Sequence, residues 1–111
     1  MPLEPEHRRE PDSPAKERAI AALRDVFDPE IPINIFDLGL IYRLDISPEG
    51  HAEIVMTLTS PNCPVAESLP GDVERAVAGV EGVKSTHLEL VWDPPFSMEM
   101  LSEAARLQLN L

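Results

Sequence analysis

The residue with the clearest chemical potential is Cys63, the single cysteine among the 111 residues of the chain. It lies in residues 57–64 (TLTSPNCP), where an alternating, strand-like pattern gives way to a helical one. Pro64 suits the first position of a helix, because its missing N–H would have no partner there. Cys63 is therefore predicted at or near a helix N-cap, where unpaired N–H groups and the helix dipole favour the thiolate that binds metals or attacks electrophiles. The alternative is a small buried apolar side chain, the commonest setting of an unpaired cysteine.

Oxygen-bearing side chains are predicted to gather around this thiol. Asp28, Glu30 and Asp37 precede the first predicted strand, and Thr59 follows the second. In a hairpin the start of one strand lies beside the end of the next, so we expect Asp37 close to Thr59 and Cys63. A thiolate among carboxylates and hydroxyls can help to bind a cation or a cluster iron. The alternative is that these side chains cap turns, which is a common role for Asp and Thr.

The elements that position these residues follow the order α-β-β-α-β-α. Apolar periodicity, caps and breakers predict helices over 14–27, from Pro64 to Gly79 and after Ser97, with strands over 40–46, 52–58 and 87–92. At Pro70 we expect either a kink or a short turn followed by the main helix from about Gly71 to Gly79. The inner face of the last helix would use Met98, Leu101 and Ala105. The first two strands form a hairpin, and the intervening helix returns the chain so that the third strand runs parallel to the second. The predicted fold is a two-layer α/β (α+β) domain with helices on one face of a small mixed three-stranded sheet.

Length and charge restrict the classes of function. The chain is long enough for one small domain, predicted over residues 13–111, after a disordered leader over residues 1–12 that is rich in proline and charge. A formal net charge of −11 without a basic stripe argues against nucleic-acid binding. No apolar run approaches the ~20 residues of a membrane span, and no secretory signal peptide is present. We therefore expect no membrane association and a cytoplasmic location.

Four segments resemble one known family. They are residues 28–31 (DPEI), 37–42 (DLGLIY), 57–59 (TLT) followed by Cys63 and Pro64, and 90–95 (LVWDPP). In this order they resemble the iron–sulfur cluster assembly domain family, which includes SufT-like and PaaD-like proteins and the eukaryotic cytosolic iron–sulfur targeting proteins. The similarity extends over roughly residues 15–109. It implies the same small α/β fold, a functional thiol at Cys63, and an acidic lining from the residues that correspond to Asp28, Glu30 and Asp37.

The resemblance also implies a role. It indicates an accessory factor in iron–sulfur protein maturation that works with the assembly machinery and client apoproteins and has no enzymatic activity. An iron–sulfur cluster usually takes four thiolates, whereas one protomer offers one. We therefore expect no stably bound cofactor, and a transient iron or cluster that Cys63 shares with a client or with a second protomer in a homodimer.

Alternatives remain at this stage. PaaD-like members serve in the assembly of a multicomponent oxygenase and add a C-terminal cysteine-rich segment, which is not found up to Leu111, so the SufT-like interpretation is favoured. An adaptor that docks clients would not require the thiol. A small thiol enzyme would need a base beside Cys63, but His7, His51 and His87 are all predicted to lie away from it.

Overall fold

The computed structural model describes residues 6, 13–27, 33–58, 69–93 and 95–109. The described elements, in chain order, are α1 (Pro14–Leu23), α2 (Ile35–Leu38), β1 (Ile41–Ile46), β2 (His51–Met56), α3 (Leu69–Ala78), β3 (Ser85–Leu90), the 3₁₀ turn η3 (Met98–Met100) and α4 (Glu103–Gln108). None of the described helices is long and apolar enough to cross a membrane.

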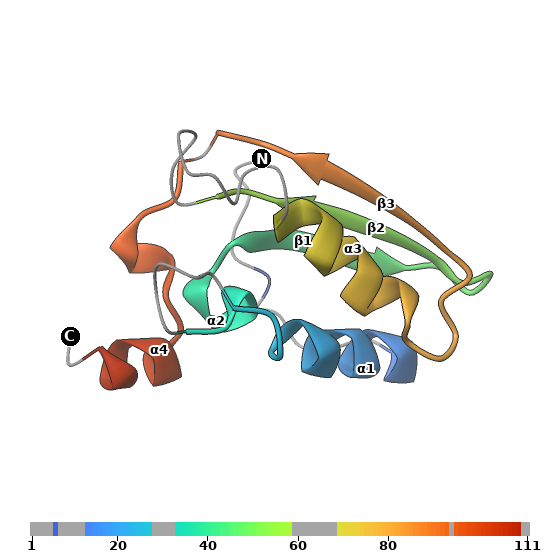
Figure 1. The fold of residues 1–111 in the computed structure, drawn as a ribbon, viewed down its shortest axis with the longest axis horizontal. Helices are drawn as coiled ribbons and strands as arrows, with labels where there is room; N and C mark the ends of the chain where they lie inside the picture. Colours follow the sequence, from blue (N-terminus) through green and yellow to red (C-terminus); the bar gives the residue numbers. More distant parts are fainter. Residues whose placement is uncertain (1–5, 7–12, 28–32, 59–68, 94, 110–111) are drawn as a thin grey trace.

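The sheet has the predicted mixed topology. Its strand order is β1-β2-β3, with β1 antiparallel to β2 and β2 parallel to β3 (Figure 1). The register pairs Ile54 with Leu44 on one side and with Leu88 on the other. Helix α3 connects the two parallel strands and packs on β3, while α1 packs on both α3 and β1. The α+β fold with helices on one face of a three-stranded sheet is therefore confirmed.

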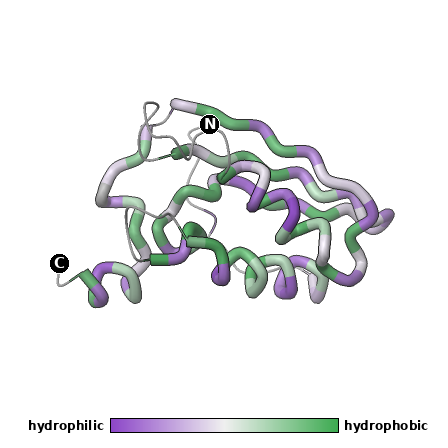
Figure 2. The backbone as a smooth tube through the Cα atoms, in the orientation of Figure 1, coloured by the Kyte–Doolittle hydropathy of each residue, from purple (hydrophilic) through white to green (hydrophobic). Residues whose placement is uncertain are grey.

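The core lies between the helices and the sheet. Ile54 and Met56 of β2 face Leu23 of α1 and Val73 and Val77 of α3, and all five side chains are fully buried. Figure 2 shows the same division as hydrophobic colour on the facing sides of these elements and hydrophilic colour on the outer side of α1 and α3. Burial of these apolar side chains is the main stabilising contribution to a domain of this size.

The first helix is shorter than its periodicity predicts. Helix α1 begins as expected, with the Ser13 hydroxyl accepting the Lys16 N–H at 3.2 Å, but it ends at Leu23 with Arg24 as C-cap. Beyond it, Phe27 forms an isolated antiparallel bridge with Asn34, and the Phe27 side chain is 54% exposed. The prediction that the helix reaches Phe27 is wrong, because backbone pairing with a later segment replaces the helical hydrogen bonds there.

Two further local features differ from the sequence prediction, and a third decides between its alternatives. Helix α2 was not predicted, and its N-cap is Asn34. Pro70 falls in the first turn of α3, where a missing N–H is tolerated, so the second alternative holds and the main helix runs close to the predicted range of 71–79. The last helix is capped by Ser102 rather than by Ser97, since the Ser102 hydroxyl accepts the Ala105 N–H at 3.1 Å. Leu101 and Ala105 are buried as predicted.

Within the range predicted as a disordered leader, the described residue is Glu6, and it is fully buried. Its Oε2 accepts the Leu44 N–H at 3.1 Å, and its Oε1 lies 2.5 Å from Lys16 Nζ. At least this point of the leader packs on α1 and β1. The domain boundary at residue 13 stays a prediction.

Candidate functional site

Asp37 is the predicted site residue that falls within the described part of the chain. Cys63, Asp28, Glu30 and Thr59 lie outside the described residues, so their grouping with Asp37 stays a prediction. The geometry available is that of Asp37 and of the strand ends that lead into those segments.

Asp37 is held by local contacts in α2. Its backbone N–H donates to Asn34 Oδ1 at 2.8 Å, and Asn34 Nδ2 donates to Asp37 Oδ2 at 2.9 Å. Arg24 Nε lies 3.8 Å from the same carboxylate oxygen, and the Arg24 guanidinium stacks over the Phe36 ring at 5.2 Å from its centroid. With its side chain 17% exposed and one oxygen already engaged, Asp37 has the contacts of a residue that fixes the α2 turn.

The C-terminal segment closes over this turn. The Ser102 N–H donates to the Asp37 carbonyl at 2.8 Å. Gly39, the C-cap of α2, has a left-handed φ of 90°, and a Cβ placed there would stand 2.4 Å from the Met100 carbonyl oxygen. The Asp37 segment and the η3 turn therefore touch through backbone atoms, at a position that only glycine can occupy without displacement.

The two strand ends meet as the hairpin predicts. The Thr57 N–H donates to the Leu40 carbonyl at 2.9 Å, which places the chain just before Thr59 beside the chain just after Asp37. Thr57 is fully buried. This contact supports the expected closeness of the two loops, although it does not include Cys63.

Sequence reasoning missed a cluster at this end of the sheet. The register of β1 on β2 shifts between Ile41 and Arg43, which marks a β-bulge at Tyr42, and the Tyr42 side chain is fully buried. The Tyr42 hydroxyl donates to Met100 Sδ at 3.3 Å. Burial raises the pKa of Tyr42, and the negative charge of Asp93 raises it further. The alternating apolar pattern of residues 40–46 does not reveal where a bulge lies, so no pattern in the sequence indicates this cluster.

The described histidines lie on the open face of the sheet, as expected for His87. His51 Nε2 is 2.8 Å from Glu53 Oε1, and His87 Nδ1 is 2.9 Å from Glu53 Oε2. Hydrogen bonding to Glu53 raises the pKa of His87. The pKa of Glu53 is lowered most by its hydrogen bond with His51 and next by its hydrogen bond with His87. Within the described ranges no three His, Cys, Asp or Glu side chains are arranged to hold a metal ion.

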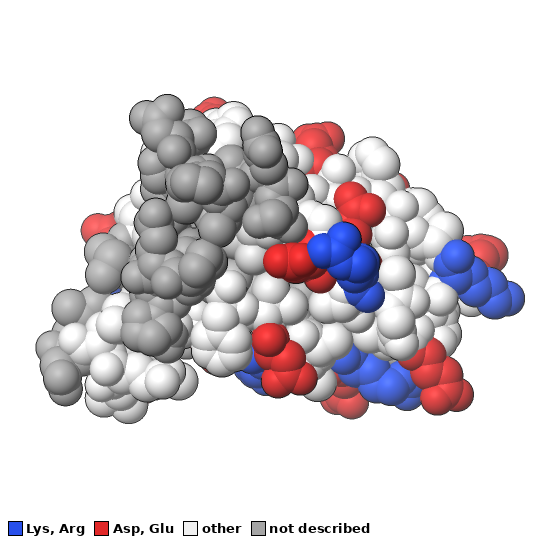
Figure 3. Space-filling view, in the orientation of Figure 1, with Lys and Arg blue, Asp and Glu red and all other residues white. Residues whose placement is uncertain are grey.

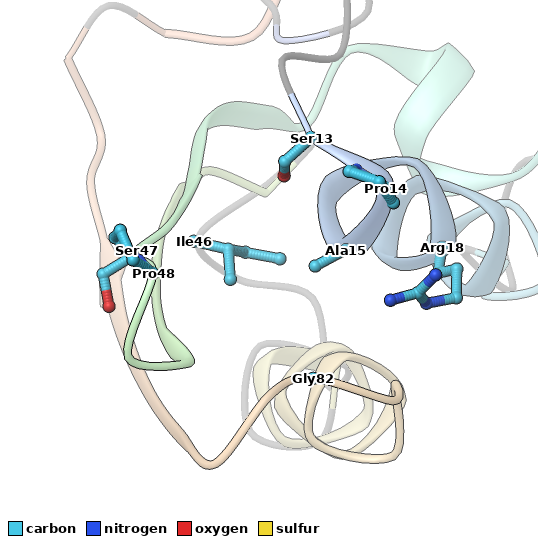
Figure 4. A pocket seen from close by; sticks show the side chains of 8 residues that line it. All are labelled: Ser13, Pro14, Ala15, Arg18, Ile46, Ser47, Pro48 and Gly82. Carbon is cyan, nitrogen blue, oxygen red and sulfur yellow. The ribbon is translucent and has the colours of Figure 1, made fainter.

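A surface hollow lies at the other end of the domain. It has a volume of about 480 Å³ and lies between the start of α1, the β1–β2 turn and Gly82 (Figure 4). Its cationic side chain, Arg18, donates to the Glu81 carbonyl at 3.2 Å. Figure 3 shows Lys and Arg side chains beside Asp and Glu side chains on the visible described surface, without a continuous basic area.

Comparison with known proteins agrees with the fold and with the motifs. The sequence profile of the iron–sulfur cluster assembly protein family matches residues 16–90. The chain is 45% identical to an Fe-S protein maturation auxiliary factor of Porphyromonas gingivalis, over 86% of this chain and 90% of that protein. It is 38% identical to the Fe-S protein maturation auxiliary factor YitW of Bacillus subtilis, over 86% and 94%.

A solved structure shows the same architecture. A domain of unknown function from Bacillus anthracis superimposes with a TM-score of 0.79 at 34% identity, covering 87% of this chain and 92% of that one. The class of molecule is thus a small α+β domain with a mixed three-stranded sheet. The chain belongs to the iron–sulfur cluster assembly protein family, and the resemblance seen in the sequence is confirmed.

Proposed function

We propose that this chain is a non-enzymatic accessory factor of iron–sulfur protein maturation, in which Cys63 binds or passes iron or a cluster transiently to client apoproteins. The observation that carries the proposal is the 45% identity, over most of both chains, to a protein named as an Fe-S protein maturation auxiliary factor. The SufT factor of Staphylococcus aureus, 35% identical over 78% of this chain, supports the same role. The cytoplasm is the proposed location.

One thiolate per protomer limits how a cluster can be held. Because a cluster usually takes four thiolates, the missing ligands come from a client, from the assembly machinery or from a second protomer. Asp37 contributes little as a ligand in this proposal, since its Oδ2 is already engaged by Asn34. It acts by fixing the turn that leads into β1.

The test compares Cys63→Ser with the native chain in anaerobic reconstitution with ferrous iron and sulfide. Serine keeps the small polar side chain and its capping capacity but removes the soft sulfur ligand. Iron content and native mass should be measured together. We expect iron on the native chain in substoichiometric or shared form, no iron on Cys63→Ser, and the same circular dichroism for both.

Asp37→Asn is the matched control. It keeps a side-chain oxygen that can accept the hydrogen bond from Asn34 Nδ2 but removes the negative charge of Asp37. Iron binding should survive this change if Asp37 positions the turn, and should be lost if its charge is needed to bind iron. Full iron retention by Cys63→Ser would contradict the proposed thiol ligand, and unchanged maturation of a client by that variant would leave a docking role without thiol chemistry.

A further inference from the structure

Strand β1 lies at one edge of the sheet and has backbone groups directed away from β2. The Leu44 N–H is one of them, since it donates to Glu6 and not to a neighbouring strand. An exposed edge of this kind is a template for pairing with another strand. The side chain of Leu44 is itself fully buried, so the edge borders the core.

Glu6 covers this edge from a remote part of the sequence. Its Oε2 accepts the Leu44 N–H at 3.1 Å, across 38 positions, and its Oε1 forms an ion pair with Lys16 at 2.5 Å. The side chain of Glu6 is 0% exposed and that of Lys16 is 6% exposed. One carboxylate thus joins α1 to the edge of β1 and occupies a hydrogen-bonding position that a further strand would need.

The sequence of β1 is complementary to itself in the antiparallel direction. In a pair of β1 strands centred on Leu44, Arg43 of each strand stands opposite Asp45 of the other. Within one chain these two side chains are exposed and already form an ion pair with each other. Cross-strand pairs of opposite charge stabilise antiparallel strands, and a pair centred on one residue gives the two-fold symmetry of most homodimers.

We propose that Glu6 is a built-in cap of the β1 edge, and that its removal opens this edge to β1 of a second copy of the chain. The cap keeps an acidic protein of net charge −11 from pairing edge to edge through β1. This device does not depend on iron or on Cys63, so it can fail while the proposed function holds.

The test removes the carboxylate in the full-length chain. At concentrations where the variant is still monomeric, Glu6→Ala should increase hydrogen exchange of the Leu44 amide by about tenfold or more, the factor that corresponds to one hydrogen bond to a charged group. It should also shift the chain toward a dimer in light scattering over a concentration series. Glu17→Ala, which removes an exposed carboxylate from α1, is the control for net charge and should change neither quantity.

Two additional variants keep the test decisive. If Glu6→Ala does not fold because Lys16 is left buried without a partner, Glu6→Ala with Lys16→Met removes both charges and should dimerise. Arg43→Glu in the uncapped chain sets like charges opposite each other and should return it to a monomer. Uncapped variants that stay monomeric over the whole series would overturn the proposal. The proposal would also be overturned if the native chain, with Glu6 in place, were already a dimer that Arg43→Glu dissociates. The β1 edge would then be open despite the cap.

Discussion

Replacing Gly39 by alanine tests the contact between the Asp37 turn and the C-terminal segment. Gly39 has a φ of 90°, and an added Cβ would lie 2.4 Å from the Met100 carbonyl oxygen and 2.9 Å from its carbonyl carbon. Both neighbours are backbone atoms, so they cannot rotate away as the tip of a side chain can. Either the turn or the η3 segment must shift.

The cost has two main parts. A left-handed conformation costs a residue with a Cβ about 1–2 kcal/mol, and an overpacked contact costs about 1–3 kcal/mol. The smaller entropy of the unfolded alanine chain returns about 0.4–1 kcal/mol. We therefore expect Gly39→Ala to lower the free energy of unfolding by about 3 kcal/mol, with a fall in Tm on the order of 10 °C.

Urea and thermal unfolding followed by circular dichroism measure this loss, with Gly79→Ala as the control. A Cβ at Gly79 would meet its nearest neighbour, the Arg75 carbonyl oxygen, at an ordinary 3.6 Å, and the φ of Gly79 is not in the left-handed region. This control should change stability by less than about 1 kcal/mol. A Gly39→Ala variant as stable as the control would refute the close packing of η3 against the turn.

Three further predictions concern the cap of α2, the open face and the core. Asn34→Ala should cost about 1 kcal/mol in urea unfolding, because it removes the side chain that accepts the Asp37 N–H, whereas Asn34→Ser should retain most of the cap. Glu53→Gln should lower the pKa of His87 in an NMR titration, and an unchanged pKa would show that the pair does not form in solution. In the native chain, the raised pKa of His87 contributes stability to the fold that is fully present below pH 6.5 and is lost as the pH rises through the folded-state pKa. The lowered pKa of Glu53 contributes stability that is present above pH 4.5 and is lost as the pH falls through the folded-state pKa. The pair should thus stabilise most between pH 4.5 and 6.5, and Glu53→Gln should lower Tm more within this window than outside it. Ile54→Ala, at a fully buried position of the central strand, should cost about 2–5 kcal/mol, and a loss below about 1 kcal/mol would contradict its place in the core.

Local patterns carried much of the fold. Alternation over residues 40–58 predicted the hairpin, and the helix that follows predicted the parallel third strand, both of which are confirmed. The Ser13–Pro14 start of α1 was readable because an N-cap depends on neighbours within one helical turn. For the candidate site, the hairpin predicted that the two strand ends meet, and the Leu40–Thr57 hydrogen bond agrees with it, while the grouping of Asp37 with Thr59 and Cys63 stays a prediction.

The sequence by itself therefore determined the three strands, their relative directions, the helix between the parallel strands and the motifs that resemble the family, since each rests on periodicity or spacing over a few residues. The tertiary structure decided features that depend on distant partners. Helix α1 stops early because Phe27 pairs with Asn34, and Tyr42 is buried by a bulge whose register only β2 can set. Gly39 and Glu6 have their roles because Met100 and Lys16 reach them from other parts of the chain. Such contacts have no sequence period, because packing in the folded state selects the partner.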